Sequence, residues 1–184
     1  MTAPDSPATL TLGHSTRTAA ELIKLLEAHG ANAVVDVRKM PRSKRNPQFN
    51  ADTLPAELKE RGIGYLHPPS LGGLRRPRPD SPNTGWRNDS FRGYADYMRT
   101  PEFREGIEEV VRLCAEGRPC LMCAEAVPWR CHRRLIADAL LAQGFAVGHI
   151  LSESRLQPHT LTPLARIEPD TGALTYPPEE ESLF

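Results

Sequence analysis

The sequence has 184 residues and lacks a long apolar run and a surplus of either charge. No stretch approaches the roughly 18 apolar residues of a transmembrane helix, and the polar residues 1–6 have neither the basic nor the apolar part of a secretory signal. We therefore expect a cytoplasmic protein without a membrane partner. Because 39% of the residues are apolar and the 23 basic and 23 acidic residues cancel, an intrinsically disordered chain is excluded.

Cysteine is also scarce, and all four cysteines lie between positions 114 and 131. A chain of this length does not need disulfides to fold, so we expect reduced thiols. The sequence contains none of the long glycine patterns of nucleotide-binding loops and no internal repeat.

The pattern of apolar residues predicts strands that alternate with helices. Short apolar runs are typical of strands at 8–13, 33–37, 65–67, 120–124 and 145–151, and helical spacing occurs around 22–29, 54–58, 91–99, 101–116 and 130–143. Apolar strands of this kind are buried on both faces. We therefore expect one three-layer α/β domain over 8–152, with a mostly parallel sheet of about five strands and helices on both faces.

Two segments fall outside this alternation. Residues 68–90 contain five prolines and three glycines and predict a long irregular insertion, a class of loop that is often functional. Residues 153–184 form a proline-rich C-terminal extension in which 164–176 has the pattern of a small hairpin.

Polar residues follow most of the predicted strands. Ligands of parallel α/β sheets bind at the carboxyl ends of the strands, so these residues are expected to converge on one edge of the sheet. The densest group is Cys123, Glu125, Cys131 and His132, which we predict to be catalytic, with a thiol as nucleophile and Glu125 or His132 as proton carrier. The start of the following helix and Arg133, an expected anion clamp, would favour the thiolate form of Cys131.

Alternatives to a catalytic thiol remain open. A metal could bind Cys123, Cys131 and His132, with His14 as a fourth ligand, but the spacing differs from the close cysteine pairs of structural zinc sites. We therefore assign no metal ligand and leave the cofactor unknown. Cys114 and Cys120 are expected to be small core residues.

Substrate-binding residues are predicted from glycine, hydroxyl and basic groups at the strand ends. Gly13, His14 and Ser15 could hold an anion at a helix start, or form an ordinary capped turn. Five of the eight residues from 38 to 45 are basic, and we assign Arg38 and Arg42 to anion binding. Asp36 could orient a histidine of the site, or form a structural ion pair with Arg38.

The irregular insertion and the helix after it add Gly72, Gly73 and Tyr94 to the predicted binding set. Arginines alternate with aromatic residues here, which is typical of surfaces that stack bases, although Tyr94 and its neighbours at helical spacing would also suit core or lid packing. His29, His149 and His159 show no functional pattern in their surroundings.

The motifs Gly13-His14-Ser15, Asp36-Val37-Arg38 and Cys131-His132-Arg133 resemble the bacterial family called domain of unknown function 488. The resemblance spans roughly residues 9–152 and is carried by segments 12–15, 35–38, 41–43, 46–49, 71–73, 91–98, 121–125 and 131–133. It implies a small α/β protein and, as the family name records no activity, no catalytic residue. A looser likeness to rhodanese and cysteine-phosphatase domains is an analogy only, because Glu125 would repel an anion bound at Cys123.

We therefore expect an enzyme, a hydrolase or a transferase, that acts on an anionic, phosphate-bearing substrate, nucleotide-like or nucleic acid. The alternatives are a non-catalytic nucleic-acid-binding module, whose affinity would fall steeply with salt, and a metal-binding domain. The sequence does not indicate an oligomeric state.

Overall fold

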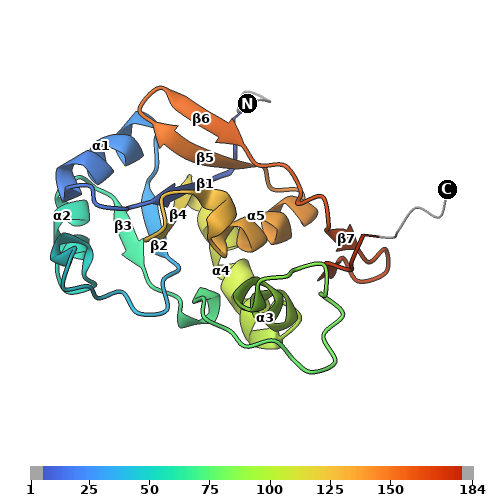
Figure 1. Ribbon diagram of the computed structural model, residues 1–184. Helices are drawn as coiled ribbons and strands as arrows, with labels where there is room; N and C mark the ends of the chain where they lie inside the picture. The colour runs from blue at the N-terminus through green and yellow to red at the C-terminus, as the bar shows by residue number, and fades with distance from the viewer. Residues whose placement is uncertain (1–5, 180–184) are drawn as a thin grey trace.

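The computed structural model describes residues 6–179 and contains a six-stranded sheet with the strand order β3-β2-β4-β1-β5-β6 (Figure 1). Its strands are β1 (Thr9–Gly13), β2 (Ala33–Asp36), β3 (Gly64–Leu66), β4 (Pro119–Cys123), β5 (Val147–Ser152) and β6 (Arg155–Pro158). All neighbouring strands are parallel except β5 and β6, so the predicted mostly parallel sheet is confirmed. The sixth strand comes from the C-terminal extension, immediately after β5.

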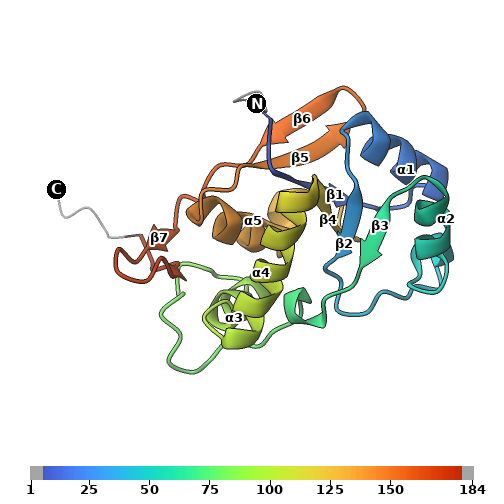
Figure 2. The ribbon, with the colours of Figure 1, turned by 180° about the vertical axis from the view of Figure 1, so that it is seen from behind.

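Helices cover both faces of this sheet, which confirms the three-layer α/β architecture. The helices are α1 (Ala19–Ala28), α2 (Leu54–Glu60), α3 (Asp89–Tyr97), α4 (Pro101–Glu116) and α5 (Arg133–Ala142). One hydrophobic core packs α1 and α2 against one face, and a second core packs the other three helices against the opposite face (Figures 1 and 2). No helix of the described residues is long and apolar enough to cross a membrane.

Local sequence signals set the helix starts. Thr18 caps α1 through a reciprocal capping box with Glu21, and Thr100 caps α4 with Pro101 at its first position. Helix α5 begins at Arg133 and not at Arg130 as predicted, because Pro128–Arg130 forms a separate 3-10 turn, η3. Cys131 and His132 therefore lie just before the helix and not within its first turn.

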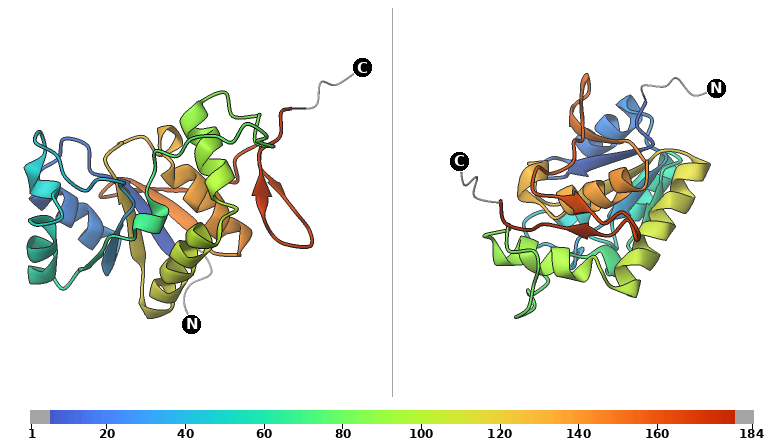
Figure 3. Two further views of the ribbon diagram at one scale, coloured as in Figure 1. Left: turned by 90° about the horizontal axis from the view of Figure 1, so that it is seen from below. Right: turned by 90° about the vertical axis from the view of Figure 1, so that its right-hand side faces the viewer.

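The remaining segments are the irregular insertion and the C-terminal extension. The irregular insertion contains only the 3-10 turn η2 (Pro69–Leu71) before α3 begins. In the C-terminal extension, β7 (Arg166–Ile167) and β8 (Leu174–Thr175) pair antiparallel, at the end of the molecule away from α1 and α2 (Figure 3). Residues 180–184 of the extension, and residues 1–5, lie outside the described residues.

Candidate active site

A cavity of about 500 Å³ lies where β2 and β4 end. Its walls come from the segment after β2, the irregular insertion, α3 and the loop that joins β4 to α5. Seven of the predicted site residues line it, namely Arg38, Gly73, Tyr94, Cys123, Glu125, Cys131 and His132; the other lining residues are Lys39, Met40, Leu74, Asn88, Ser90, Phe91, Ala124 and Arg130. The expected convergence of polar residues at the carboxyl ends of the strands is therefore seen for Arg38, which follows β2, and for Cys123, Glu125, Cys131 and His132, at the end of β4 and in the loop after it.

Two thiols and an imidazole meet in the wall of this cavity. The Sγ atoms of Cys123 and Cys131 and a ring nitrogen of His132 all lie within 4.8 Å of one another. His132 Nδ1 is 3.7 Å from the Cys131 Sγ, and its Nε2 is 2.8 Å from the carbonyl oxygen of Val37. Because a carbonyl can only accept, Nε2 carries a proton and Nδ1 is left to exchange a proton with Cys131.

Arg133 is buried beside this cluster, with 1% of its surface exposed. Its Nε donates to the Cys131 Sγ at 3.4 Å, its Nη1 donates to the Thr11 hydroxyl at 3.2 Å, and its Nη2 donates to the Glu125 carbonyl oxygen. Within residues 6–179 no carboxylate pairs with this guanidinium. A buried cation is costly without an anion, and among the described residues the one ionisable side chain to which Arg133 donates a hydrogen bond is Cys131.

These contacts shift the pKa values of the two thiols in opposite directions. A hydrogen bond from Cys123, together with His132 and Arg133, holds the pKa of Cys131 well below its usual value, although burial opposes this. The pKa of Cys123 is raised, because Cys123 donates to Cys131 and because it is buried. These contacts favour the thiolate form at Cys131 and the protonated thiol at Cys123.

The other two cysteines lie outside the cluster, as predicted. Cys120 faces the core on the α1 side of the sheet, and burial raises its pKa to about 12. Burial also raises the pKa of Cys114, on α4. The reactivity of Cys131 can therefore be compared with that of these two thiols in the same protein.

Asp36 and Arg38 form a buried ion pair at the end of β2. The Arg38 Nε and Nη2 donate to the two carboxylate oxygens at 2.8 and 2.6 Å, and the Tyr65 hydroxyl donates to the same carboxylate at 2.6 Å. Arg38 also donates to the Phe49 carbonyl oxygen and to His14 Nε2. Most Arg38 donors are thus used within the protein, and the guanidinium presents only a limited edge to the cavity.

The Gly13-His14-Ser15 segment holds the loop after β4 in place through backbone hydrogen bonds. The backbone N–H groups of His14 and Ser15 donate to the carbonyl oxygens of Cys123 and Ala124, so they are not free to bind an anion. A Cβ on Gly13 would lie 2.0 Å from the Glu125 carbonyl oxygen, which explains why glycine is required here. Burial lowers the pKa of His14, whose Nδ1 donates to the Ser15 carbonyl oxygen at 2.8 Å.

The other seven predicted site residues do not line the cavity, namely Gly13, His14, Ser15, Asp36, Arg42, Gly72 and Arg133. Arg42 is exposed and pairs with Asp52 at 3.0 Å on the surface. Gly72 is buried against the backbone of Lys39.

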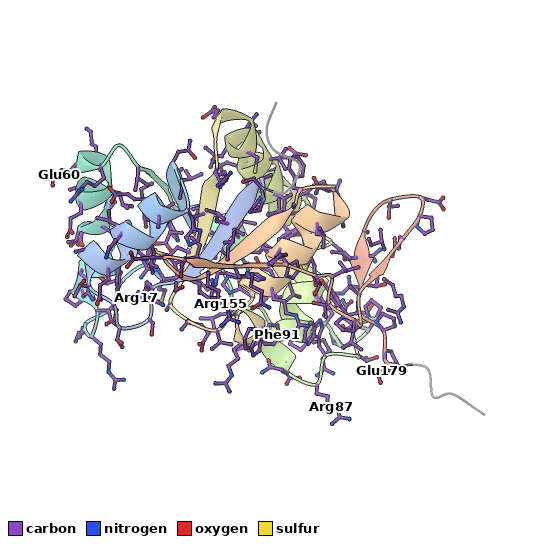
Figure 4. The ribbon with its side chains drawn as sticks, turned by 90° about the horizontal axis from the view of Figure 1, so that it is seen from above. Arg17, Glu60, Arg87, Phe91, Arg155 and Glu179 are labelled. Atoms are coloured by element: carbon purple, nitrogen blue, oxygen red, sulfur yellow. The ribbon has the colours of Figure 1, made fainter. Side chains whose placement is uncertain are left out.

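The aromatic residues of α3 mainly pack inside the protein. The Tyr94 and Tyr97 hydroxyls donate to the carbonyl oxygens of Leu71 and Ser70, which holds the insertion against α3. Phe91 lies at the cavity wall and stacks on Trp86, whereas Arg87 extends away from the ribbon (Figure 4). The alternation of arginine and aromatic residues therefore does not form one continuous stacking surface.

Sequence reasoning missed the partners of His149 and His159. These two side chains hydrogen bond to each other at 3.0 Å, and His159 also bonds to Asp138. One signal was available: Thr9 and Thr11 alternate with leucines on β1. A central strand is buried on both faces, so these hydroxyls need hydrogen-bond partners inside the protein.

Comparison with known proteins gives a family and nothing more specific. The family model described as Domain of unknown function DUF488 matches residues 18–140. No curated protein and no solved structure gives a match.

Proposed function

Because the chain belongs to the DUF488 family, whose description names no activity, we propose a function from the cavity itself: an enzyme that uses the Cys131 thiolate as a nucleophile on an anionic substrate. The observation that carries this proposal is the buried Arg133 guanidinium, which contacts the Cys131 sulfur and has no carboxylate partner within residues 6–179. A thiolate is the reactive form of cysteine, and a buried cation at this distance stabilises it.

His132 is the proposed general base and acid. Its Nδ1 takes the Cys131 proton, while the Val37 carbonyl keeps the ring oriented through Nε2. The thiolate then forms a bond to an electrophilic phosphorus or carbon atom, and the bond to the leaving group breaks. The leaving group receives the proton from His132 Nδ1. Attack by water completes a hydrolase cycle, and attack by another acceptor completes a transferase cycle, with Cys131 released in either case.

Glu125 is placed to act in the second step. It lines the cavity at an exposed position, and its side chain accepts the Val127 backbone N–H at 3.0 Å. That bond uses one carboxylate oxygen, and the carboxylate retains capacity to accept a proton from an attacking water. We assign Glu125 the general-base role in the release of the covalent intermediate.

The charges of the cavity wall favour an anionic, phosphate-bearing substrate, nucleotide-like or nucleic acid. Lys39, Arg130 and the edge of Arg38 supply positive charge, against the single carboxylate of Glu125. Met40 and Leu74 line the same cavity with 74% and 72% of their surfaces exposed. Leu74 holds a left-handed φ of 59°, an uncommon backbone conformation for leucine that is often kept at a functional site.

The first experiment measures thiol alkylation by iodoacetamide as a function of pH, with the modified cysteine identified by mass spectrometry. We expect Cys131 to react at a pH well below that needed for Cys114 or Cys120, and His132→Ala to shift its profile upward. A panel of phosphate esters and nucleotides then tests turnover, which Cys131→Ser should abolish and Cys114→Ser should not. An ordinary Cys131 profile, or turnover by Cys131→Ser, refutes the proposal.

A second candidate function is metal binding, favoured by the mutual distances of the same cluster. The 3.7 Å separation of Cys131 Sγ and His132 Nδ1 suits two ligands of one tetrahedral zinc ion, and the Val37 carbonyl orients the imidazole as outer partners of metal ligands do. Elemental analysis of untagged protein after zinc reconstitution tests this. Stoichiometric zinc that is lost in Cys123→Ser but kept in Cys120→Ser would support it, and the absence of stoichiometric zinc rejects it.

A further inference from the structure

A chain of buried hydrogen bonds leads from Arg133 into the core. We call its four members, Thr11, His149, His159 and Asp138, the histidine relay. The links are Arg133 Nη1 to Thr11 Oγ1 (3.2 Å), Thr11 Oγ1 to His149 Nδ1 (2.7 Å), His149 Nε2 to His159 Nδ1 (3.0 Å) and His159 Nε2 to Asp138 Oδ1 (2.8 Å). Thr11 and Asp138 are fully buried, and 5% of His149 is exposed.

The last member fixes the direction of these bonds. The Asp138 carboxylate also accepts the Thr162 backbone N–H and the Tyr176 hydroxyl, so it acts as an acceptor toward His159 as well. With a proton on His159 Nε2, the arrangement that pairs every N–H and O–H has His149 donating to His159 and Thr11 donating to His149. The Thr11 oxygen then turns its lone pair toward Arg133.

Burial keeps His149 uncharged, which preserves this direction. Burial, then His159 and Arg133, lower its pKa to about 3, with Arg134 and Asp138 as the other charged groups that act on it. A second proton on His149 would sit on Nδ1 and compete with the Thr11 hydroxyl proton. An uncharged His149 therefore leaves its Nδ1 able to accept the Thr11 hydroxyl proton.

The relay orients Arg133 and does not conduct protons to the thiol, because a guanidinium does not release its proton in proteins. Without the Thr11 oxygen, the Arg133 Nη1 would be a buried donor lacking this acceptor, and the guanidinium would lose one of its three anchors. We propose that the histidine relay positions Arg133 against the Cys131 sulfur, so that Thr11 and His149 are positioning residues for the thiolate. This inference rests on the proposed function.

The test compares two threonines on the same face of β1. Thr11→Val removes the Arg133 acceptor with little change in volume, and Thr11→Ser keeps the hydroxyl. The matched control is Thr9→Val, since Thr9 is equally buried but donates to the Pro119 carbonyl oxygen at 2.9 Å. We expect Thr11→Val to slow Cys131 alkylation about tenfold near pH 6, equivalent to about one unit of thiol pKa, and Thr11→Ser and Thr9→Val to react like the wild type.

A second variant, His149→Leu, keeps the test decisive if Thr11→Val does not fold. It breaks the relay one step further from Arg133 and should slow Cys131 alkylation in the same direction by a smaller factor. An unchanged Cys131 profile in a folded Thr11→Val or His149→Leu protein overturns the relay while the thiolate proposal stands. An ordinary Cys131 profile in the wild type refutes the proposed function instead, so the two failures are distinguishable.

Discussion

The Arg133 Nε lies 3.4 Å from the Cys131 Sγ, and these two residues are separated by only one position in the sequence. Cys131 directly follows the η3 turn and Arg133 begins α5, so the contact is made where the chain enters the helix. Positive charge from the helix start and the guanidinium therefore acts on the same sulfur atom. In the proposed thiolate form, Cys131 supplies the counter-charge that the buried Arg133 guanidinium needs.

Loss of Cys131 should destabilise the fold because it leaves Arg133 without an anion. We expect Cys131→Ser to lower the free energy of unfolding by about 3 kcal/mol. The double variant Cys131→Ser with Arg133→Met should lose much less stability than the sum of the losses in the two single variants. Urea denaturation of the four proteins of this cycle measures the coupling. Strictly additive free energies would contradict a thiolate–guanidinium pair.

Asp36 should be important for stability because it is the carboxylate of a buried pair. Asp36→Asn is expected to cost about 3 to 5 kcal/mol, since it leaves Arg38 as an uncompensated cation. Asp52→Asn is the control: it breaks the exposed Arg42 pair and should change the free energy of unfolding by less than about 1 kcal/mol. Equal effects of the two substitutions in urea denaturation would show that the buried pair is not structural and would favour a substrate role for Asp36.

Much of the fold was predictable, because the spacing of apolar residues and the polar residues that follow each strand can both be read from short segments of the sequence. Val34 and Val35 belong to opposite cores, which is what an apolar strand buried on both faces requires. Cys123 and Asp36 end neighbouring parallel strands, so the topology alone brings their ends to one edge of the sheet.

What the sequence could not indicate were the contacts that depend on tertiary pairing. Thr11 and His149 are 138 positions apart, and nothing near either residue marks the other as its partner. A cluster of basic residues in the sequence also does not show where each side chain points. Arg42 belongs to a basic segment beside the cavity, yet it pairs with Asp52 on the surface. Burial of Arg133 is a third example, because the apolar pattern of α5 does not show which polar residue points inward.

Gly73 should control the position of His132. A Cβ at Gly73 would lie 2.9 Å from His132 Nδ1, so Gly73→Ala must shift the imidazole and weaken its bond to the Val37 carbonyl. We expect the alkylation of Cys131 near neutral pH to be slower by about threefold or more, which corresponds to about 0.7 kcal/mol in the free energy of activation. Gly64→Ala is the control, because its Cβ would meet only ordinary contacts, the nearest at 3.6 Å. Equal alkylation rates in the two variants would argue against His132 as the proton acceptor.

Acid should destabilise the protein through His149. Its pKa is about 3 in the folded state against an ordinary 6.5, so between these values the unfolded chain binds the extra proton. The stability that comes from an uncharged His149 is therefore complete above about pH 6.5 and is lost as the pH falls toward 3, with a slope of up to about 1.4 kcal/mol per pH unit. Urea midpoints measured across this range should fall less steeply for His149→Leu than for the wild type. His29→Gln is the control, because His29 bonds to the Ser152 carbonyl oxygen near the surface. A His149→Leu protein with the wild-type slope would mean that His149 accepts a proton in the fold at its ordinary pKa.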